Sequence, residues 1–357
     1  MTFKQVNRLW WGQSWHWLLG FMAIMLLIGL GTAVKTTQQH VQNTHESATM
    51  HAQAVEEYRK HPEDFQLDGH QVSLAAYNSE QNQIFPKNQF KLHSYMLRPE
   101  VPSNNWLYLV MAVAGLILAF WGRRTHYTEF MLSLGVTRTQ LFLTQLLQSL
   151  ALTVTVAVAQ LLHWTWIIMV VPKNYQIYRD LPGLFGNNVA IVTISFGLLT
   201  LGWLMGQLTD RFWLAGLLAA LSWRFMNGVA SSYGYAAFFF GQSVIPPEFW
   251  FYAHAYVASA VSAGLALIAV GLVWRLSVTW SAEQSAFTRQ SGLKKWTMIA
   301  VMTIAGGALV GDILFQPFAK SGLPWFELLG MAVLCIGLLG GSTYQQHRSK
   351  EAHYDAS

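Results

Sequence analysis

The sequence predicts an all-α integral membrane protein with about eight transmembrane helices and with both termini in the cytoplasm. Three observations lead to this fold class. Apolar residues make up 53% of the 357-residue chain and charged residues only 11%, whereas soluble proteins carry roughly 25% charged residues. The apolar residues form runs of about 20, the length that a helix needs to cross a bilayer. Basic residues are concentrated in alternate connections between these runs, as the positive-inside rule requires.

Eight apolar segments qualify as membrane spans. Backbone groups in hydrocarbon must be hydrogen bonded within their own segment, so each span is expected to be helical. Arg224 interrupts the fifth span, and Gly202 and Gly206 in the fourth predict close packing against a neighbouring helix. Spans two to six fall within 106–274, and spans seven and eight within 297–344. The segments are Trp15–Val34, Trp106–Trp121, Leu146–Val171, Asn188–Leu208, Phe212–Ala230, Phe251–Trp274, Thr297–Gln316 and Trp325–Tyr344.

The basic residues set the expected orientation. The short outer loops hold Lys173, Arg179 and Lys320. With the N-terminus inside, the cytoplasmic segments include the loop 275–296 and the tail 345–357. These segments hold many more basic residues, namely Lys4, Arg8, Arg123, Arg124, Arg138, Arg211, Arg275, Arg289, Lys294, Lys295, Arg348 and Lys350. This asymmetry places both termini in the cytoplasm.

The segment before the first span, 1–14, is expected to be a short helix in the inner membrane interface. Its apolar residues recur on one helical face, away from Lys4 and Arg8. Gly31-Thr32-Ala33 resembles a signal-peptide cleavage site. The apolar run of the first span, 15–34, is longer than the 7–15 residues of a usual signal peptide, so we expect it to be retained.

The segment 35–105 is polar and is expected to form a small extracellular domain. Thr36–His61 contains no Gly or Pro, so the first helix is expected to continue outward until Pro62. Asp68-Gly69 predicts a turn and Gln71–Ala75 a short strand. The six histidines of this segment match no metal-ligand spacing, so surface positions are expected for His40, His45, His51, His61, His70 and His93.

The segment 231–250 is too broken by Gly and Pro to span and too apolar for a watery loop. A re-entrant element at the outer leaflet accounts for both properties. A lipid-dipping hairpin without a role in transport is the alternative.

Motifs for ATP hydrolysis, zinc proteolysis and serine hydrolysis are absent from the sequence. The single cysteine, Cys335, excludes an internal disulfide. We therefore predict no catalytic residues, no metal and no cofactor. Arg224 and Asp312 are charges within spans and are candidates for a pathway or for an intramembrane pair, although both could also reach the outer interface.

The segment 123–143 is unusual among the cytoplasmic connections. Its apolar side includes Phe130 and Leu134, and Gly135 is expected to divide it into two short helices. Its polar anchors are Arg123, Arg124, Glu129 and Arg138. Such an element can rest on the membrane while it presents residues to a soluble partner; the alternative is a loop that lies flat on lipid.

This pattern resembles the permeases of ABC-2 type exporters. The resemblance covers roughly residues 1–274 and rests on the motif E-F-x-L-S-L-G-V-T-R-x-Q-L-F, which includes Glu129, Phe130, Leu134, Gly135 and Arg138. It implies a six-span core and a coupling helix that docks on a separate ABC ATPase subunit. It also implies a helix before the first span and re-entrant elements between spans five and six. The long outer segment and the two additional spans depart from that pattern and leave the substrate open.

The resemblance implies a permease subunit of an ATP-driven exporter in the bacterial cell membrane, paired with a second, identical or different permease. The aromatic residues near the expected exit favour an amphipathic substrate over ions, and nucleic acid is not an expected partner. One alternative is a non-transporting membrane subunit whose ATPase drives the outer domain mechanically. Another is a membrane-embedded enzyme that uses His163, His254, Asp312 or Glu327.

Overall fold

The structure, a computed structural model, describes residues 1–67, 70–85, 105–177, 179, 181–208, 213–217, 219, 255–279, 296–297 and 299–301. Several predicted features lie outside these residues. They are most of the fifth and seventh spans, the eighth span, the re-entrant segment 231–250, and the intramembrane charges Arg224 and Asp312.

Five helices in the described part are long and apolar enough to cross a membrane, so the chain is a multi-pass helical membrane protein. They correspond to the first, second, third, fourth and sixth predicted spans. These helices are α1 (Phe3–Thr49), α5 (Asn105–Arg124), α7 (Arg138–Val170), α8 (Leu181–Leu208) and α11 (Ala255–Thr279).

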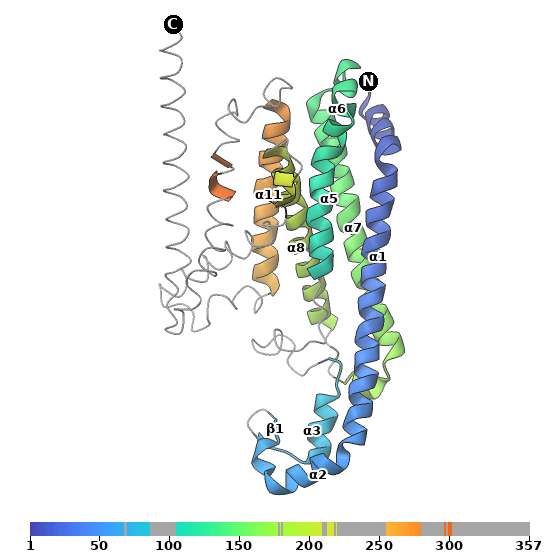
Figure 1. The fold of residues 1–357 in the computed structure, drawn as a ribbon, viewed down its shortest axis with the longest axis vertical. Coiled ribbons are helices and arrows are strands. Elements are labelled where there is room, and N and C mark those ends of the chain that lie inside the picture. Colours follow the sequence, from blue (N-terminus) through green and yellow to red (C-terminus); the bar gives the residue numbers. More distant parts are fainter. Residues whose placement is uncertain are drawn as a thin grey trace.

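The five helices form a bundle in which α8 packs against both α5 and α11, and α1 packs along α7 (Figure 1). One apolar core lies among α5, α8 and α11, and includes Trp203 and Val273. A second lies among α1, α5, α7 and α8, and includes Met25 and Leu152. The bundle is therefore held by two apolar clusters that share α5 and α8.

Glycines let α5 and α8 approach very closely. A Cβ placed on Gly115 would overlap the backbone oxygen of Leu199, and one on Gly202 would overlap that of Ala112. This confirms the close packing predicted at Gly202, and identifies α5 as the neighbouring helix.

Helix α1 differs from the expected arrangement of a separate interfacial helix over 1–14. It runs without a break from Phe3 to Thr49, so it is about 70 Å long at 1.5 Å per residue. Its first turns stay in line with the rest of the helix because Val6, Trp10 and Ser14 are buried against the bundle. The predicted continuation of the first helix beyond its span is confirmed as far as Thr49, but the helix ends there rather than at Pro62, because a turn at Met50 separates it from the next helix.

A small cap follows α1, and we use this name for residues 51–81. It comprises α2 (His51–Lys60), the 3-10 turn η1 (Pro62–Asp64), the strands β1 (Gln66–Leu67) and β2 (His70–Gln71), and α3 (Leu74–Gln81). Edge-on contacts of the Phe65 ring with Tyr58 and Tyr77, at 5.2 and 5.1 Å between centroids, form its small core. The predicted strand Gln71–Ala75 is wrong beyond Gln71, because the Ser73 hydroxyl accepts from the Ala76 N–H and starts α3.

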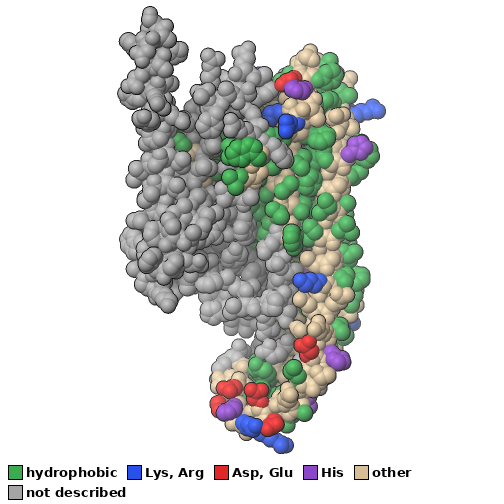
Figure 2. All heavy atoms as spheres, viewed as in Figure 1, with side chains coloured by type: hydrophobic (Ala, Val, Ile, Leu, Met, Phe, Trp, Pro, Cys, Tyr) green, Lys and Arg blue, Asp and Glu red, His purple; other side chains and the backbone are tan. Residues whose placement is uncertain are grey.

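Among the described residues, most charged side chains on the face drawn in Figure 2 lie towards the two ends, and hydrophobic side chains are frequent on the stretch between them. The cap marks one end. The opposite end, which holds the start of α1, the end of α5 and the start of α7, is called the basic end below (Figure 1). Its described charged residues are Lys4, Arg8, Arg123, Arg124, Glu129, Arg138 and Arg275.

Candidate functional site at the basic end

The connection between α5 and α7 contains a short helix, α6 (Tyr127–Ser133). It ends in a Schellman motif, since the Val136 N–H donates to the Met131 carbonyl at 3.2 Å and the Gly135 N–H to the Leu132 carbonyl at 3.0 Å. Gly135 has φ of 80°, a left-handed conformation that residues with a Cβ rarely adopt. The helix break expected at Gly135 is therefore present.

Helix α7 begins immediately after this turn. Thr137 and Gln140 form a capping box in which each side chain accepts from the other residue's N–H, at 3.2 and 3.0 Å. Both ends of the α6–α7 turn are thus fixed by local hydrogen bonds. These bonds fix the direction of α6 relative to α7.

One side of α6 packs on the start of α1. Met131 is fully buried in a cluster with Val6 and Trp10. The Tyr127 hydroxyl donates to the Leu9 carbonyl at 3.2 Å, and the Tyr127 ring lies 5.4 Å from that of Trp10. Burial raises the pKa of Tyr127, which keeps the phenol protonated as a donor. Helix α6 is therefore attached to α1 as well as to α7.

The other side of α6 is open. Phe130 is 51% exposed and Leu134, the C-cap residue of α6, is 41% exposed, and the two lie one helical turn apart. Glu129 beside them is exposed, and one of its carboxylate oxygens lies 2.9 Å from His126 Nδ1. Arg124 is exposed as well. An exposed apolar pair flanked by charges is a surface suited to contact with another protein.

Two of the predicted anchors, Arg123 and Arg138, point into the bundle instead. Arg123 donates through Nε to the Ala119 carbonyl at 3.1 Å and through Nη2 to the Gly206 carbonyl at the end of α8. Its guanidinium also lies 5.0 Å from the Phe120 ring centroid. Arg138 donates through Nη1 to the Val278 carbonyl of α11 at 2.7 Å. The Gly206 and Val278 carbonyls both lie in the last turn of a helix, where positive charge is favourable. Their role in the described structure is to join helices.

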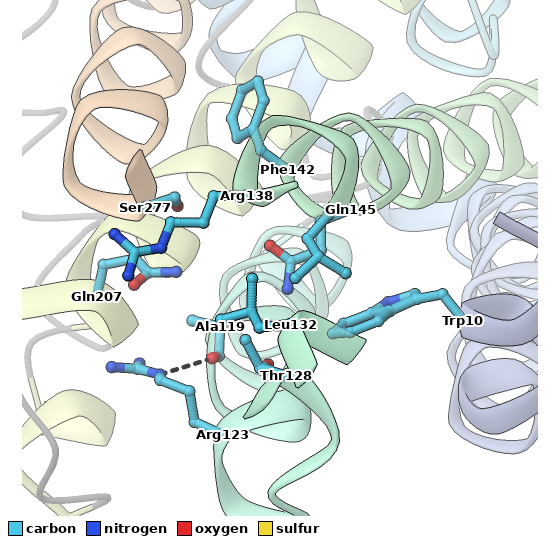
Figure 3. A pocket seen from close by; sticks show the side chains of 11 residues that line it. Trp10, Ala119, Arg123, Thr128, Leu132, Arg138, Phe142, Gln145, Gln207 and Ser277 are labelled. Carbon is cyan, nitrogen blue, oxygen red and sulfur yellow. Dashed lines mark hydrogen bonds between the residues drawn. The ribbon is translucent and has the colours of Figure 1, made fainter. Parts of the chain in front are cut away.

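A pocket lies between these arginines, bounded by α1, α5, α6, α7, α8 and α11 (Figure 3). It holds about 40 Å³ of free space, far less than the roughly 300–1,000 Å³ of a typical site for a small molecule. Its polar lining includes Gln145, Gln207 and Ser277 in addition to the arginines. The pocket can take a small polar group but not a whole substrate.

A buried polar chain joins α1 to α7 beside this site, and sequence reasoning missed it. The Trp10 indole N–H donates to Gln148 Oε1 at 3.2 Å, and Gln148 Nε2 donates to Ser14 Oγ at 2.6 Å. The sequence did carry a signal for this contact, because Gln148 lies within an apolar run and Ser14 lies at the start of another. Polar side chains within a membrane span tend to hydrogen bond to a neighbouring helix.

Of the remaining candidates, the structure describes only His163. His163 is buried between α1 and α7, where its Nδ1 lies 3.2 Å from Thr32 Oγ1 and 3.3 Å from the Gly29 carbonyl. His254, Asp312 and Glu327 lie outside the described residues. Among the residues that are described, no three His, Cys, Asp or Glu side chains are close enough to bind a metal ion.

Comparison of the chain with family models, with curated proteins and with solved structures found no match.

Proposed function

We propose that the chain is the transmembrane permease subunit of an ATP-driven ABC exporter in a bacterial cell membrane. The observation that carries the proposal is the exposed pair Phe130 and Leu134, of which Phe130 lies in α6 and Leu134 is its C-cap residue, at the basic end. The positive-inside rule assigns that end to the cytoplasm. A separate ATPase subunit docks on the pair, because the sequence contains no P-loop of its own.

Motion of the ATPase would reach the membrane through the two attachments of α6. One is the apolar cluster with α1, and the other is the short turn through Gly135 into α7. The ATPase must bind one conformation of the permease more tightly than the other. A partner that binds both conformations equally would not shift the equilibrium between them. A second permease completes the pathway, and the exported substrate is an unidentified amphipathic compound.

The test replaces Phe130 and Leu134 together by alanine and co-expresses the variant with an ABC ATPase subunit that co-purifies with the unmodified chain. We expect loss of co-purification and of permease-dependent ATP hydrolysis. Both side chains are exposed, so the thermal unfolding midpoint should stay close to that of the unmodified chain.

The matched control replaces Leu147 and Leu150 on α7, which are 40% and 44% exposed but lie away from α6. That pair should keep the ATPase. Retention of the ATPase by the Phe130 and Leu134 variant would exclude α6 as the docking element.

The continuous helix α1 favours one alternative, a subunit that works mechanically. A single rod connects α6, through Val6 and Trp10, to the cap at the other end. In this alternative the ATPase moves the cap and the chain exports nothing. Replacing residues 51–81 by a flexible Gly-Ser linker separates the two: an exporter would still transport, whereas a mechanical subunit would keep its ATPase coupling and lose its function.

A further inference from the structure

The pocket at the basic end has an excess of hydrogen-bond donors. Arg138 has five guanidinium N–H groups, and its one hydrogen bond to the described chain is to the Val278 carbonyl at 2.7 Å. Several of its donors therefore remain for a ligand. Arg138 is the first residue of α7, so its backbone position is set by the capping box at Thr137.

Two further polar side chains in this pocket have no partner in the part of the chain that the structure describes. Gln207 on α8 is only 8% exposed, and its amide makes no hydrogen bond there. The Ser277 hydroxyl on α11 is buried and equally unpaired. Figure 3 draws both side chains beside the Arg138 guanidinium. Buried polar groups without partners are costly, so this arrangement indicates a ligand that accepts hydrogen bonds.

The described residues that line the pocket give it a positive charge. The C-terminus of α11 carries about half a negative charge, and the full positive charge of Arg138 outweighs it. None of the described residues that line the pocket is Asp or Glu. Glu129 is the one described carboxylate at the basic end, and it is paired with His126 outside the pocket. An anion is therefore favoured over a neutral acceptor.

We propose that this pocket binds the phosphate group of an anionic phospholipid from the adjoining leaflet. A phosphate offers several acceptor oxygens to a guanidinium, an amide and a hydroxyl, and arginine is well suited to it. The small volume admits a phosphate group and excludes a nucleotide. Basic pockets between helices at the cytoplasmic side of membranes bind lipid headgroups in this way. The site does not depend on the transport function proposed above.

The test measures lipid binding to the full chain in detergent by native mass spectrometry, with phosphatidylglycerol and phosphatidylcholine as the probes. Arg138→Gln removes the charge, Gln207→Met removes only the amide, and Ser277→Ala removes only the hydroxyl. We expect Arg138→Gln to weaken phosphatidylglycerol binding roughly tenfold to hundredfold, because a charge-assisted hydrogen bond is lost. Gln207→Met should weaken it several-fold even if Arg138→Gln does not fold, and phosphatidylcholine should bind weakly to every form.

Arg124→Gln is the matched control, because Arg124 is an exposed arginine at the same end and does not line the pocket. Its phosphatidylglycerol binding should stay close to that of the unmodified chain. Equal losses of phosphatidylglycerol binding in Arg124→Gln and Arg138→Gln would overturn the proposal in favour of general attraction to a positive surface. Unchanged binding in Gln207→Met and Ser277→Ala would overturn it as well.

A second experiment adds inorganic phosphate to the chain with bound phosphatidylglycerol. Competition with phosphatidylglycerol in the unmodified chain, shifted to higher phosphate concentration in Gln207→Met, would confirm a phosphate site and show that free phosphate also enters it.

Discussion

Arg138 and Val278 join the beginning of one membrane helix to the end of another. The guanidinium of Arg138, at the first position of α7, donates through Nη1 to the Val278 carbonyl of α11 at 2.7 Å. The last carbonyls of a helix lack partners within the helix, so a cation at that place satisfies a backbone group and the helix dipole together. Two segments that are 140 residues apart in the sequence are thus held at the same end of the bundle.

Replacing Arg138 by alanine should destabilise the bundle, because it leaves the end of α11 without its charged donor. We expect the free energy of unfolding to fall by about 1–3 kcal/mol. Thermal unfolding in detergent provides the measurement. Arg124→Ala removes an exposed arginine from the same end and should change stability by less than about 0.5 kcal/mol. Equal effects of the two changes would mean that the contact with Val278 contributes nothing.

The sequence predicted five of the helices correctly because apolar runs of sufficient length have few alternatives in a bilayer. It also predicted the break at Gly135, since a left-handed helix terminus needs glycine. It did not predict that Arg123 and Arg138 point inward. An arginine at a span end has the same local sequence whether it faces water or a neighbouring helix terminus, and the partners Gly206 and Val278 are distant in sequence. Only the tertiary arrangement separates the two roles.

The contact between α5 and α8 should tolerate no Cβ at Gly115 or Gly202. Alanine at either position would overlap a backbone oxygen of the facing helix, which cannot move without separating the two helices. We expect Gly115→Ala and Gly202→Ala to lower the yield of folded protein and the midpoint of thermal unfolding.

The control is Gly20→Ala on α1, where a Cβ would meet nothing within 4 Å. Alanine is a better helix former than glycine by up to about 1 kcal/mol, so this change should be neutral or stabilising. Should all three variants behave alike, helix propensity rather than close packing would govern these positions.

The chain from Trp10 through Gln148 to Ser14 should contribute to the attachment of α1. Gln148→Leu would leave the Trp10 indole N–H without its partner in a fully buried place, whereas the Ser14 hydroxyl would keep its own donation to the Trp10 carbonyl at 2.7 Å. We expect a loss of about 1–2 kcal/mol in the free energy of unfolding, since hydrogen bonds between membrane helices are worth little but buried unpaired donors cost more. Gln13→Leu, at an exposed position of α1, serves as the control and should leave stability almost unchanged. A stabilising effect of Gln148→Leu would show that apolar packing suits this site better.

Gln83 should hold the end of the cap region to the connection between α7 and α8. Its Nε2 donates to the Asn174 carbonyl at 3.0 Å and to the Ser79 carbonyl at 3.1 Å, and its Oε1 accepts from the Ile177 N–H at 3.0 Å. Gln83→Leu removes all three bonds from a residue that is only 2% exposed. Hydrogen exchange should then accelerate at the Ile177 amide more than at the Ile84 amide, because Ile84 keeps its own bond to the Tyr175 carbonyl at 3.0 Å.

The control is Gln53→Leu on α2, at an exposed position, which should change neither exchange rate. Equal acceleration at Ile84 and Ile177 would mean that the hydrogen bonds of Gln83 and Ile84 to this connection open together. Unchanged exchange rates at both amides would show that Gln83 does not hold the two segments together.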